Sequence, residues 1–367
     1  MKGKGKSGNK SQMKNIKIGN KRLDEGTFVV AEFGVNHNGS LERAKEGIIA
    51  AAKAGADAIK FQTYTADELV CKGTPKFWNF EDDNDKDQYQ AYEGLGGEPR
   101  EWYPELMKTC EENNIEFLTT VFSEETADYF NELGMKAFKI ASSDMSTLPL
   151  LDHIARFHKP ILLSTGASTL AEIKEAVKTI ECAGNFQIVI LHCTLAYPTM
   201  YKDKNQHPED ANLNLINTLQ DEFPQYLVGI SDHTMGNFSS VIAAAMGASV
   251  VEKHFTVDKT LGKSADHWFS VDPNELFSMT EFIKNVNILK GSKEKQVFPC
   301  EAETRKNDKR SLVAKTDITA GTVIKREMLT YKRPGTGIWP NKINKVIGMK
   351  TLEEIPADSI ITWDMVI

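Results

Sequence analysis

The sequence has few cysteines, and their positions fit neither crosslinks nor zinc. The five cysteines stand at positions 71, 110, 182, 193 and 300, and none belongs to a CxxC pair. An odd number at wide spacing excludes a disulfide framework and a zinc-finger pattern. We therefore expect a protein of a reducing compartment, with the cytoplasm as the simplest location.

Long apolar runs and a basic excess are also missing. No uncharged apolar run reaches the roughly 18 residues of a membrane-spanning helix. The 44 Lys and Arg residues face 51 Asp and Glu residues, and the net charge is −7. We therefore expect neither a membrane nor nucleic acid as a partner. The 41% hydrophobic and 26% charged fractions are typical of a globular protein.

The first 22 residues differ from the rest in charge. They carry eight Lys and Arg residues, and no acidic residue precedes Asp24. No apolar segment of the kind found in secretory signals follows them. We expect residues 1–22 to form a basic, disordered tail, with an arm that touches an anionic partner as the alternative.

Residues 23–290 repeat one pattern, in which a short apolar run ends in polar residues and an amphipathic stretch follows. Buried parallel strands that alternate with helices have this pattern. Eight such units favour a (β/α)8 TIM barrel over an open sheet. After the first run the sequence reads GVNHNGS rather than G-x-G-x-x-G, which disfavours a nicotinamide cofactor. The runs are residues 27–33, 57–63, 115–120, 136–141, 160–165, 187–192, 227–231 and 249–254.

The remainder of the chain predicts a linker and a second domain. Residues 291–308 are polar and aperiodic, as in a linker. Residues 309–367 contain a repeat, because 318–329 and 355–366 share four of twelve residues and their apolar spacing. A unit of this size has a small core, so we expect it to dock on its own barrel or on a partner's. Within the barrel, the long connections 64–99 and 196–210 are candidate substrate lids.

Two lysines stand near predicted strand ends, where barrel enzymes place their chemistry. A buried ammonium group needs an anion, and Lys60 and Lys139 lie on strands two and four of one ring. Two cations among hydroxyl donors suit a small polyanion such as a phosphorylated carboxylate. The alternative is that each lysine pairs with a nearby acidic residue. The hydroxyl donors are those of Thr120, Ser142, Ser164 and Ser231.

Two histidines and a carboxylate end strands that become neighbours when the barrel closes. His233 and His254 follow strands seven and eight, and Glu32 ends strand one. Imidazoles beside a carboxylate favour a divalent metal site, with histidines satisfied by hydrogen bonds as the alternative. Asp266 and His267 follow strand eight and could reach the same region.

These residues lie within motifs that resemble a known family. AEFGVNHNGS, AGADAIKFQTY, FLTTVFS, FKIASSD, ILLSTGAS, LHCTLAYPT, GISDHT and EKHFT occur in this order. They resemble the sialic acid synthase (N-acetylneuraminate synthase) family. The segment KRSLVAKTDITAGTVIKREMLTYKRPGTGI is similar to its C-terminal antifreeze-like (SAF, β-clip) domain. The resemblance runs from about residue 20 to the end of the chain.

The resemblance implies a reaction and roles for individual residues. Such enzymes condense phosphoenolpyruvate with an N-acetylated aldose and release phosphate and a nine-carbon 2-keto acid. Glu32, Lys60, Lys139 and Asp266 match catalytic positions, and His233 and His254 match ligands of Mn²⁺ or Mg²⁺. Arg310, with Lys309 as the less favoured alternative, is the candidate match for an SAF-domain arginine that reaches the partner's sugar site in a domain-swapped homodimer. Positions that match substrate contacts are Gln62, Thr120, Ser142, Asp144, Ser164, Tyr197 and Ser231.

Departures from the family pattern leave the acceptor open. Leu195 replaces a polar residue near the phosphate, Asp144 replaces a glutamate, and Ser264–Ala265 precede Asp266 in place of Gly-Pro. N-acetylmannosamine and a 2,4-diacetamido-trideoxyhexose are both candidate acceptors. Two other functions remain as alternatives. One is another phosphoenolpyruvate-dependent, aldol-type sugar-acid synthase, and the other is a non-catalytic sugar-binding protein.

Overall fold

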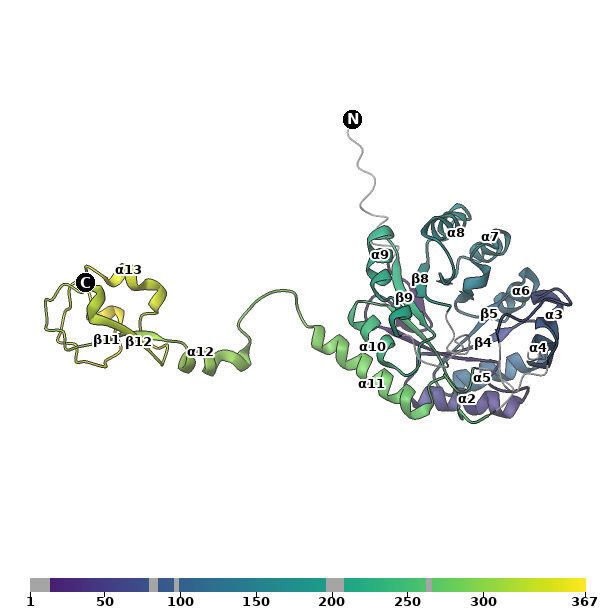
Figure 1. Ribbon diagram of the computed structural model, residues 1–367, viewed down its shortest axis with the longest axis horizontal. Coiled ribbons are helices and arrows are strands. Elements are labelled where there is room, and N and C mark those ends of the chain that lie inside the picture. Colours follow the sequence, from purple (N-terminus) through teal and green to yellow (C-terminus); the bar gives the residue numbers. More distant parts are fainter. Residues whose placement is uncertain (1–13, 79–84, 96–98, 196–207, 262–265) are drawn as a thin grey trace, which may run out of the picture. The chain divides into compact units, whose positions relative to one another are not determined.

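A computed structural model describes residues 14–78, 85–95, 99–195, 208–261 and 266–367. The chain divides into two compact units, Met1–Gly291 and Ser292–Ile367, and each is treated separately below. In the first unit, eight parallel strands close into a barrel in the order β10-β3-β4-β5-β6-β7-β8-β9, with helices around it (Figure 1). The expected TIM barrel is therefore confirmed.

The barrel strands match the eight predicted runs to within two residues at either end. Their buried, mostly continuous apolar sequences are typical of parallel strands that helices cover on the outside. The strands are β3 (Phe28–Gly34), β4 (Ala58–Thr63), β5 (Glu116–Val121), β6 (Phe138–Ile140), β7 (Ile161–Ser164), β8 (Ile188–Cys193), β9 (Leu227–Asp232) and β10 (Val250–His254).

The helices of this unit form where amphipathic segments follow a capping residue. In α2, the Ser40 side chain accepts a hydrogen bond from the backbone N–H of Arg43, and Ala44, Ile48 and Ala51 form the buried face. No described helix is long and apolar enough to cross a bilayer. The helices are α2 (Leu41–Lys53), α3 (Ala66–Leu69), α4 (Gln88–Leu95), α5 (Tyr103–Glu112), α6 (Glu124–Glu132), α7 (Leu148–Ala155), α8 (Leu170–Cys182), α9 (Asn214–Glu222), α10 (Phe238–Ala245) and α11 (Pro273–Lys290).

Along each strand, side chains point alternately into the barrel interior and into the layer beneath the helices. In β4, Ile59 and Phe61 pack into the outer core, whereas Ala58 belongs to the inner one. Lys60 has the same parity as Ala58 and therefore points inward. Gly229 of β9 is needed for tight packing, because a Cβ atom there would lie 2.5 Å from the carbonyl oxygen of Val250.

The N-terminal segment differs from the expected tail. Residues 17–18 (β1) and 21–22 (β2) form an antiparallel hairpin. Ile16 and Ile18 are fully buried and pack with the inner barrel residues near the amino ends of the strands. Lys21 forms a 2.7 Å ion pair with Asp57. The expectation of a disordered tail is thus wrong for residues 14–22, where isoleucines alternate with the lysines, and residues 1–13 lie outside the described part.

The second unit confirms the internal repeat. β11 (Ser311–Ala314) pairs with β12 (Leu329–Lys332), and α13 spans Ile343–Val346. Equivalent apolar positions of the two copies are buried together in one core. The equivalent pairs are Ile318 with Ile355, Ile324 with Ile361, and Leu329 with Val366.

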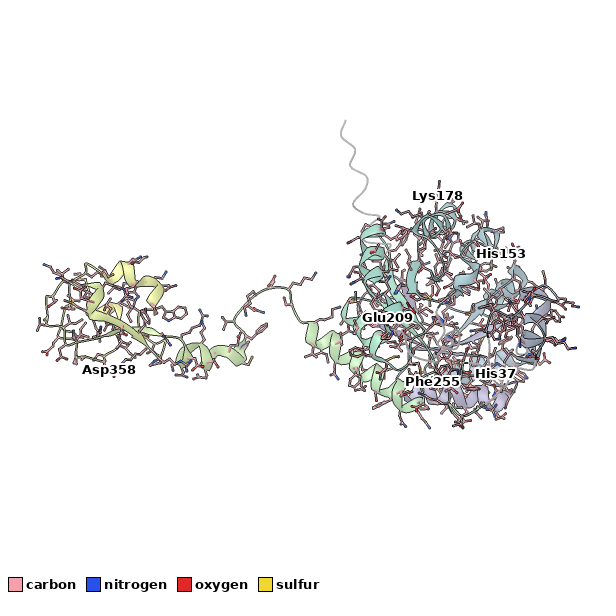
Figure 2. The ribbon with its side chains drawn as sticks, viewed as in Figure 1. His37, His153, Lys178, Glu209, Phe255 and Asp358 are labelled. Atoms are coloured by element: carbon pink, nitrogen blue, oxygen red, sulfur yellow. The ribbon has the colours of Figure 1, made fainter. Side chains whose placement is uncertain are left out.

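The predicted linker, residues 291–308, contains a helix. The unit boundary follows Gly291, and side chains 291–310 are all exposed, as expected of a connection. However, residues Ala302–Asp308 form helix α12. Figure 2 shows the side chains of both units on the same ribbon.

The hairpin gives a first testable prediction. Ile18→Ala removes a fully buried side chain from the inner core, so we expect the free energy of unfolding of the barrel to fall by about 3 kcal/mol. The exposed neighbour Lys17 supplies the matched control, Lys17→Ala. Urea denaturation followed by circular dichroism measures both variants. Equal stability of the two would contradict a structural role for the hairpin.

Candidate active site

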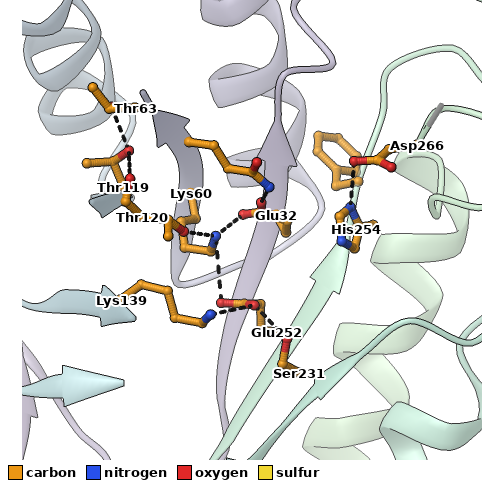
Figure 3. Close-up of polar contacts among 12 residues, drawn as sticks. Glu32, Lys60, Thr63, Thr119, Thr120, Lys139, Ser231, Glu252, His254 and Asp266 are labelled. Atoms are coloured by element: carbon orange, nitrogen blue, oxygen red, sulfur yellow. Dashed lines mark hydrogen bonds and ion pairs between the residues drawn. The ribbon is translucent and has the colours of Figure 1, made fainter. Parts of the chain in front are cut away.

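Four charged side chains meet inside the barrel at the carboxyl ends of its strands (Figure 3). Lys60 Nζ lies 2.5 Å from Glu32 Oε2 and 4.0 Å from Glu252 Oε2. Lys139 Nζ lies 3.6 Å from Glu252 Oε1. All four side chains are nearly fully buried. The two lysines therefore converge, as predicted. Each lysine also forms an ion pair with an acidic residue, which was the alternative interpretation.

Glu252 links the two lysines and had no role in the sequence analysis. Its Oε1 accepts a 2.8 Å hydrogen bond from Ser231. Burial alone would raise the pKa of Glu252, but the ammonium groups of Lys139 and Lys60 outweigh it and lower that pKa. The residue therefore stays ionised. Its inward parity in β10, two residues before His254, is the sequence signal that could have identified it.

Glu32 has the opposite electrostatic behaviour. Burial raises its pKa, and the charge of Lys60 only partly offsets this effect. Gln62 Nε2 donates a 2.6 Å hydrogen bond to Glu32 Oε1. A carboxyl group with a raised pKa exchanges a proton near neutral pH more readily than an ordinary one. The site thus holds one carboxylate kept ionised and one suited to proton transfer.

The predicted hydroxyl donors have different partners. Lys60 Nζ donates a 2.7 Å hydrogen bond to Thr120 Oγ1, and Gly166 N donates a 2.9 Å bond to Ser142 Oγ. Ser164 Oγ is buried, and no hydrogen-bond partner is present among the described residues. A buried hydroxyl without a partner is costly, which suits a position that a ligand completes.

The loop beside these hydroxyls also contacts Leu195. A Cβ atom at Gly166 would lie 2.7 Å from Leu195 Cγ and 2.9 Å from Ser142 Oγ. Leu195 therefore packs against the same backbone that Ser142 binds. Its side chain adds apolar surface here and no hydrogen-bond donor.

His233 and His254 lie side by side, with ring centroids 5.1 Å apart. Burial lowers the pKa of His233 to about 4 and that of His254 well below its usual value, so both imidazoles are neutral at neutral pH. His254 Nδ1 lies 3.5 Å from Asp266 Oδ2. Burial, with a smaller contribution from the charge of Glu32, raises the pKa of Asp266 to about 7.

This donor set is chemically suited to a divalent metal. Neutral imidazoles and a carboxylate are normal ligands of first-row metals. No group of three or more His, Cys, Asp or Glu side chains in the described ranges has the arrangement of a formed metal site. The fit therefore rests on the paired neutral rings and the adjacent carboxyl group.

A second buried ion pair lies on the outer side of the same strands. Lys253 Nζ lies 3.1 Å from Asp232 Oδ2, and both side chains are almost fully buried. Asp232 also accepts hydrogen bonds of 2.7 Å from Ser240 Oγ and 2.9 Å from Thr234 N. These contacts fix the strand ends that carry His233 and His254. Neither Asp232 nor Lys253 was a predicted site residue.

Three further site residues were predicted, namely Asp144, Tyr197 and Arg310. Asp144 lies in the turn η2 (Ser142–Asp144) after β6, where it is partly buried and burial raises its pKa. Arg310 belongs to the second unit, where its side chain is exposed. Tyr197 lies outside the described residues. The sugar contacts implied for all three therefore stay predictions.

Comparisons with known proteins agree with this architecture. The chain matches the NeuB family over residues 47–295 and the SAF domain over residues 309–367. It is 38% identical over 344 residues to the N,N'-diacetyllegionaminic acid synthase of Legionella pneumophila, covering 92% of this chain and 94% of that protein. It is 32% identical over 345 residues to the pseudaminic acid synthase of Helicobacter pylori, covering 92% of this chain and 96% of that protein.

A solved structure shares the fold as well. The N-acetylneuraminic acid (sialic acid) synthetase of Leptospira borgpetersenii aligns with a TM-score of 0.70 and 29% identity. The alignment covers 79% of this chain and 94% of that chain. The resemblance found in the motifs is thus confirmed, and the chain belongs to the NeuB family of sialic-acid-type synthases, with an SAF domain over residues 309–367.

Proposed function

We propose that this protein condenses phosphoenolpyruvate with an N-acetylated aldose, giving a nine-carbon sialic-type 2-keto acid and phosphate. The observation that carries the proposal is the pair of buried lysines, Lys60 and Lys139, which converge beside two neutral histidines. The relatives are named for synthesis of legionaminic and pseudaminic acids. Both acceptors considered above, N-acetylmannosamine and a 2,4-diacetamido-trideoxyhexose, fall within this proposal.

Phosphoenolpyruvate is the substrate that the lysines bind in this proposal. Its phosphate and carboxylate give a compact polyanion, which two ammonium groups stabilise more strongly in a buried site than in water. Ser142 and Ser164 donate hydrogen bonds to the same ligand, and Ser231 does so by turning its hydroxyl away from Glu252. Holding both anionic ends fixes the C3 carbon for attack.

The reaction forms one carbon–carbon bond and breaks one carbon–oxygen bond. C3 of phosphoenolpyruvate attacks the aldehyde carbon of the open-chain sugar, and the aldehyde oxygen takes up a proton. Water adds at C2 and loses a proton. The C2–O bond to phosphate then breaks, and the proton of the C2 hydroxyl group passes to the departing phosphate, which leaves the 2-keto acid. Glu32 is the group we assign to proton transfer, because its pKa is raised.

A divalent metal, Mn²⁺ or Mg²⁺, belongs to the same proposal. His233 and His254 would hold it, and it would supply Lewis-acid polarisation of the aldehyde. Gln62 positions Glu32 through its hydrogen bond, and Asp266 faces the sugar beside His254. Tyr197, Asp144 and Arg310 complete the sugar side in this proposal.

We further propose a homodimer in which the SAF domain of one chain serves the barrel of the other. The support is the size of that domain, whose core is small, and its exposed apolar side chains. These exposed side chains include Leu352 and Trp363, which are 55% and 51% exposed. Arg310 is the residue assigned to the partner's sugar site.

The first functional prediction concerns the substrates. We expect phosphate release from phosphoenolpyruvate only when Mn²⁺ or Mg²⁺ and an N-acetylated aminosugar are both present. A panel of N-acetylmannosamine, 2,4-diacetamido-trideoxyhexoses and simple aldose phosphates tests which acceptor is used. A colorimetric assay measures the phosphate, and mass spectrometry identifies the product. Release with an aldose phosphate alone would instead favour another aldol-type sugar-acid synthase.

The second functional prediction concerns Lys60 and His233. Lys60→Met and His233→Ala should each lower kcat/KM by about a thousandfold or more, because each removes charge stabilisation of the reacting groups. The control Lys53→Met changes an exposed lysine at the end of α2. Circular dichroism verifies that all three variants fold. Turnover close to wild type in Lys60→Met or His233→Ala would refute the assigned role.

The third functional prediction concerns the action of Arg310 across the dimer. Lys60→Met and Arg310→Ala should each be inactive alone, whereas co-expression should restore about a quarter of the wild-type rate, since random pairing leaves one site in four intact. Differently tagged chains allow purification of the mixed dimer. A fully active monomer, or no recovery in the mixed dimer, would contradict action of Arg310 across subunits.

A further inference from the structure

The loop that follows β3 is polar in sequence and yet buried. Asn36 and His37 have no exposed surface. Asn36 Nδ2 donates a 2.8 Å hydrogen bond to the carbonyl oxygen of Phe255 and lies 3.4 Å from Ser270 Oγ. Phe255 and Ser270 belong to the segment after β10, so this contact joins two loops; Figure 2 labels one residue of each, His37 and Phe255.

A second contact joins the same loops through His267. Its Nε2 lies 3.1 Å from Asn38 Oδ1, and its Nδ1 lies 2.7 Å from Thr256 Oγ1. Because the Asn38 oxygen only accepts, His267 Nε2–H donates to it, and Nδ1 accepts from the Thr256 hydroxyl. A neutral ring satisfies both contacts at once. His267 is almost fully buried, so these bonds are shielded from water.

Asp266 lies in the loop after β10, which these contacts join to the loop after β3. The carbonyl oxygen of Asp266 accepts hydrogen bonds from Ser270 N at 3.1 Å and Ser270 Oγ at 2.6 Å. Its backbone is therefore held from one side by Ser270 and from the other by His267, the next residue. Ser270 is in turn near Asn36, so both supports lead to the loop after β3.

We propose that Asn38 and His267 are positioning residues that fasten the loop of Asp266 to the loop after Glu32 and so set where the Asp266 carboxyl group meets the sugar. This inference rests on the proposed function, because it assigns Asp266 to the sugar side. It explains the polar motif after β3, which binds no substrate in the proposed mechanism. In this proposal, both residues act through the position of Asp266.

The backbone at Asn38 allows a clean substitution. Asn38 has a φ of +49°, in the left-handed region where glycine is unstrained. Asn38→Gly thus removes the side chain and keeps the turn. At position 267, asparagine places an amide near the former Nδ1, and glutamine places one near the former Nε2. His267→Asn should keep the Thr256 contact alone, and His267→Gln the Asn38 contact alone.

The experiment measures steady-state kinetics of the full-length, metal-loaded enzyme. We expect Asn38→Gly and His267→Asn to raise the KM for the sugar roughly five- to tenfold, the effect of losing about one buried hydrogen bond, with the KM for phosphoenolpyruvate nearly unchanged. His267→Gln should be closer to wild type. The double variant Asn38→Gly/His267→Asn should be no worse than either single variant, because both remove one contact. His153→Gln, on the outer helix α7, is the control histidine variant.

Two kinetic outcomes would overturn the proposal. Unchanged sugar KM in both Asn38→Gly and His267→Asn would remove the positioning role. Equal effects on both substrates, together with a lower melting temperature, would make the contacts merely structural.

Hydrogen exchange separates this inference from the proposed function. If Asn38 holds the two loops together, the backbone amides of residues 266–271 should exchange faster in Asn38→Gly than in the wild-type protein. This comparison needs no substrate. If wild type releases no phosphate with any acceptor, the proposed function fails, and the exchange data still decide whether the loops are fastened. Unchanged exchange in both Asn38→Gly and His267→Asn overturns the fastening itself.

Discussion

The burial of two lysine ammonium groups inside a closed barrel is the constraint on which the site depends. An unpaired charge in such an interior is strongly destabilising, so Lys60 and Lys139 require anions. Glu32 and Glu252 supply them in the protein alone. In the proposed function, a bound polyanion would meet the same two ammonium groups. The pairing that stabilises the barrel and the proposed binding of substrate would then be two uses of one cluster of charges.

Position within that cluster makes two equally buried carboxyl groups behave differently. Glu252 lies near both lysines, and their attraction outweighs its burial. Glu32 has Lys60 as its close cation, and the negative charge of Glu252 cancels part of that attraction. The pKa of one is lowered and that of the other is raised as a result. Separation of this kind supports the roles proposed for Glu252 as a fixed anion and for Glu32 as a proton carrier.

Much of this could be predicted from the sequence, because buried parallel strands carry a strong periodic signal. The eight strands and the lysines near their ends follow from that signal, whereas the repeat around Ile318 and Ile355 follows from residues that its two copies share. Parity within β10 places Glu252 on the inward face with His254, but it does not show that Glu252 pairs with the two lysines. The hairpin at Ile16 and Ile18 was missed because eight basic residues dominate its composition, whereas burial depends on the two isoleucines. Contacts between distant loops, such as Asn38 with His267, leave no local pattern at all.

Polar contacts on the outward-facing side of β9 and β10 also affect the geometry of the site. His233 and His254 stand on neighbouring strands, and their separation depends on how those strand ends are held. The buried pair of Asp232 and Lys253 joins the same two strands directly beneath them. An ion pair gives little net stability at this depth, since desolvation offsets most of its attraction. Its directional hydrogen bonds to Thr234 and Ser240 instead restrict the turn after His233. The barrel thus surrounds its reactive residues with polar contacts whose main effect is geometric.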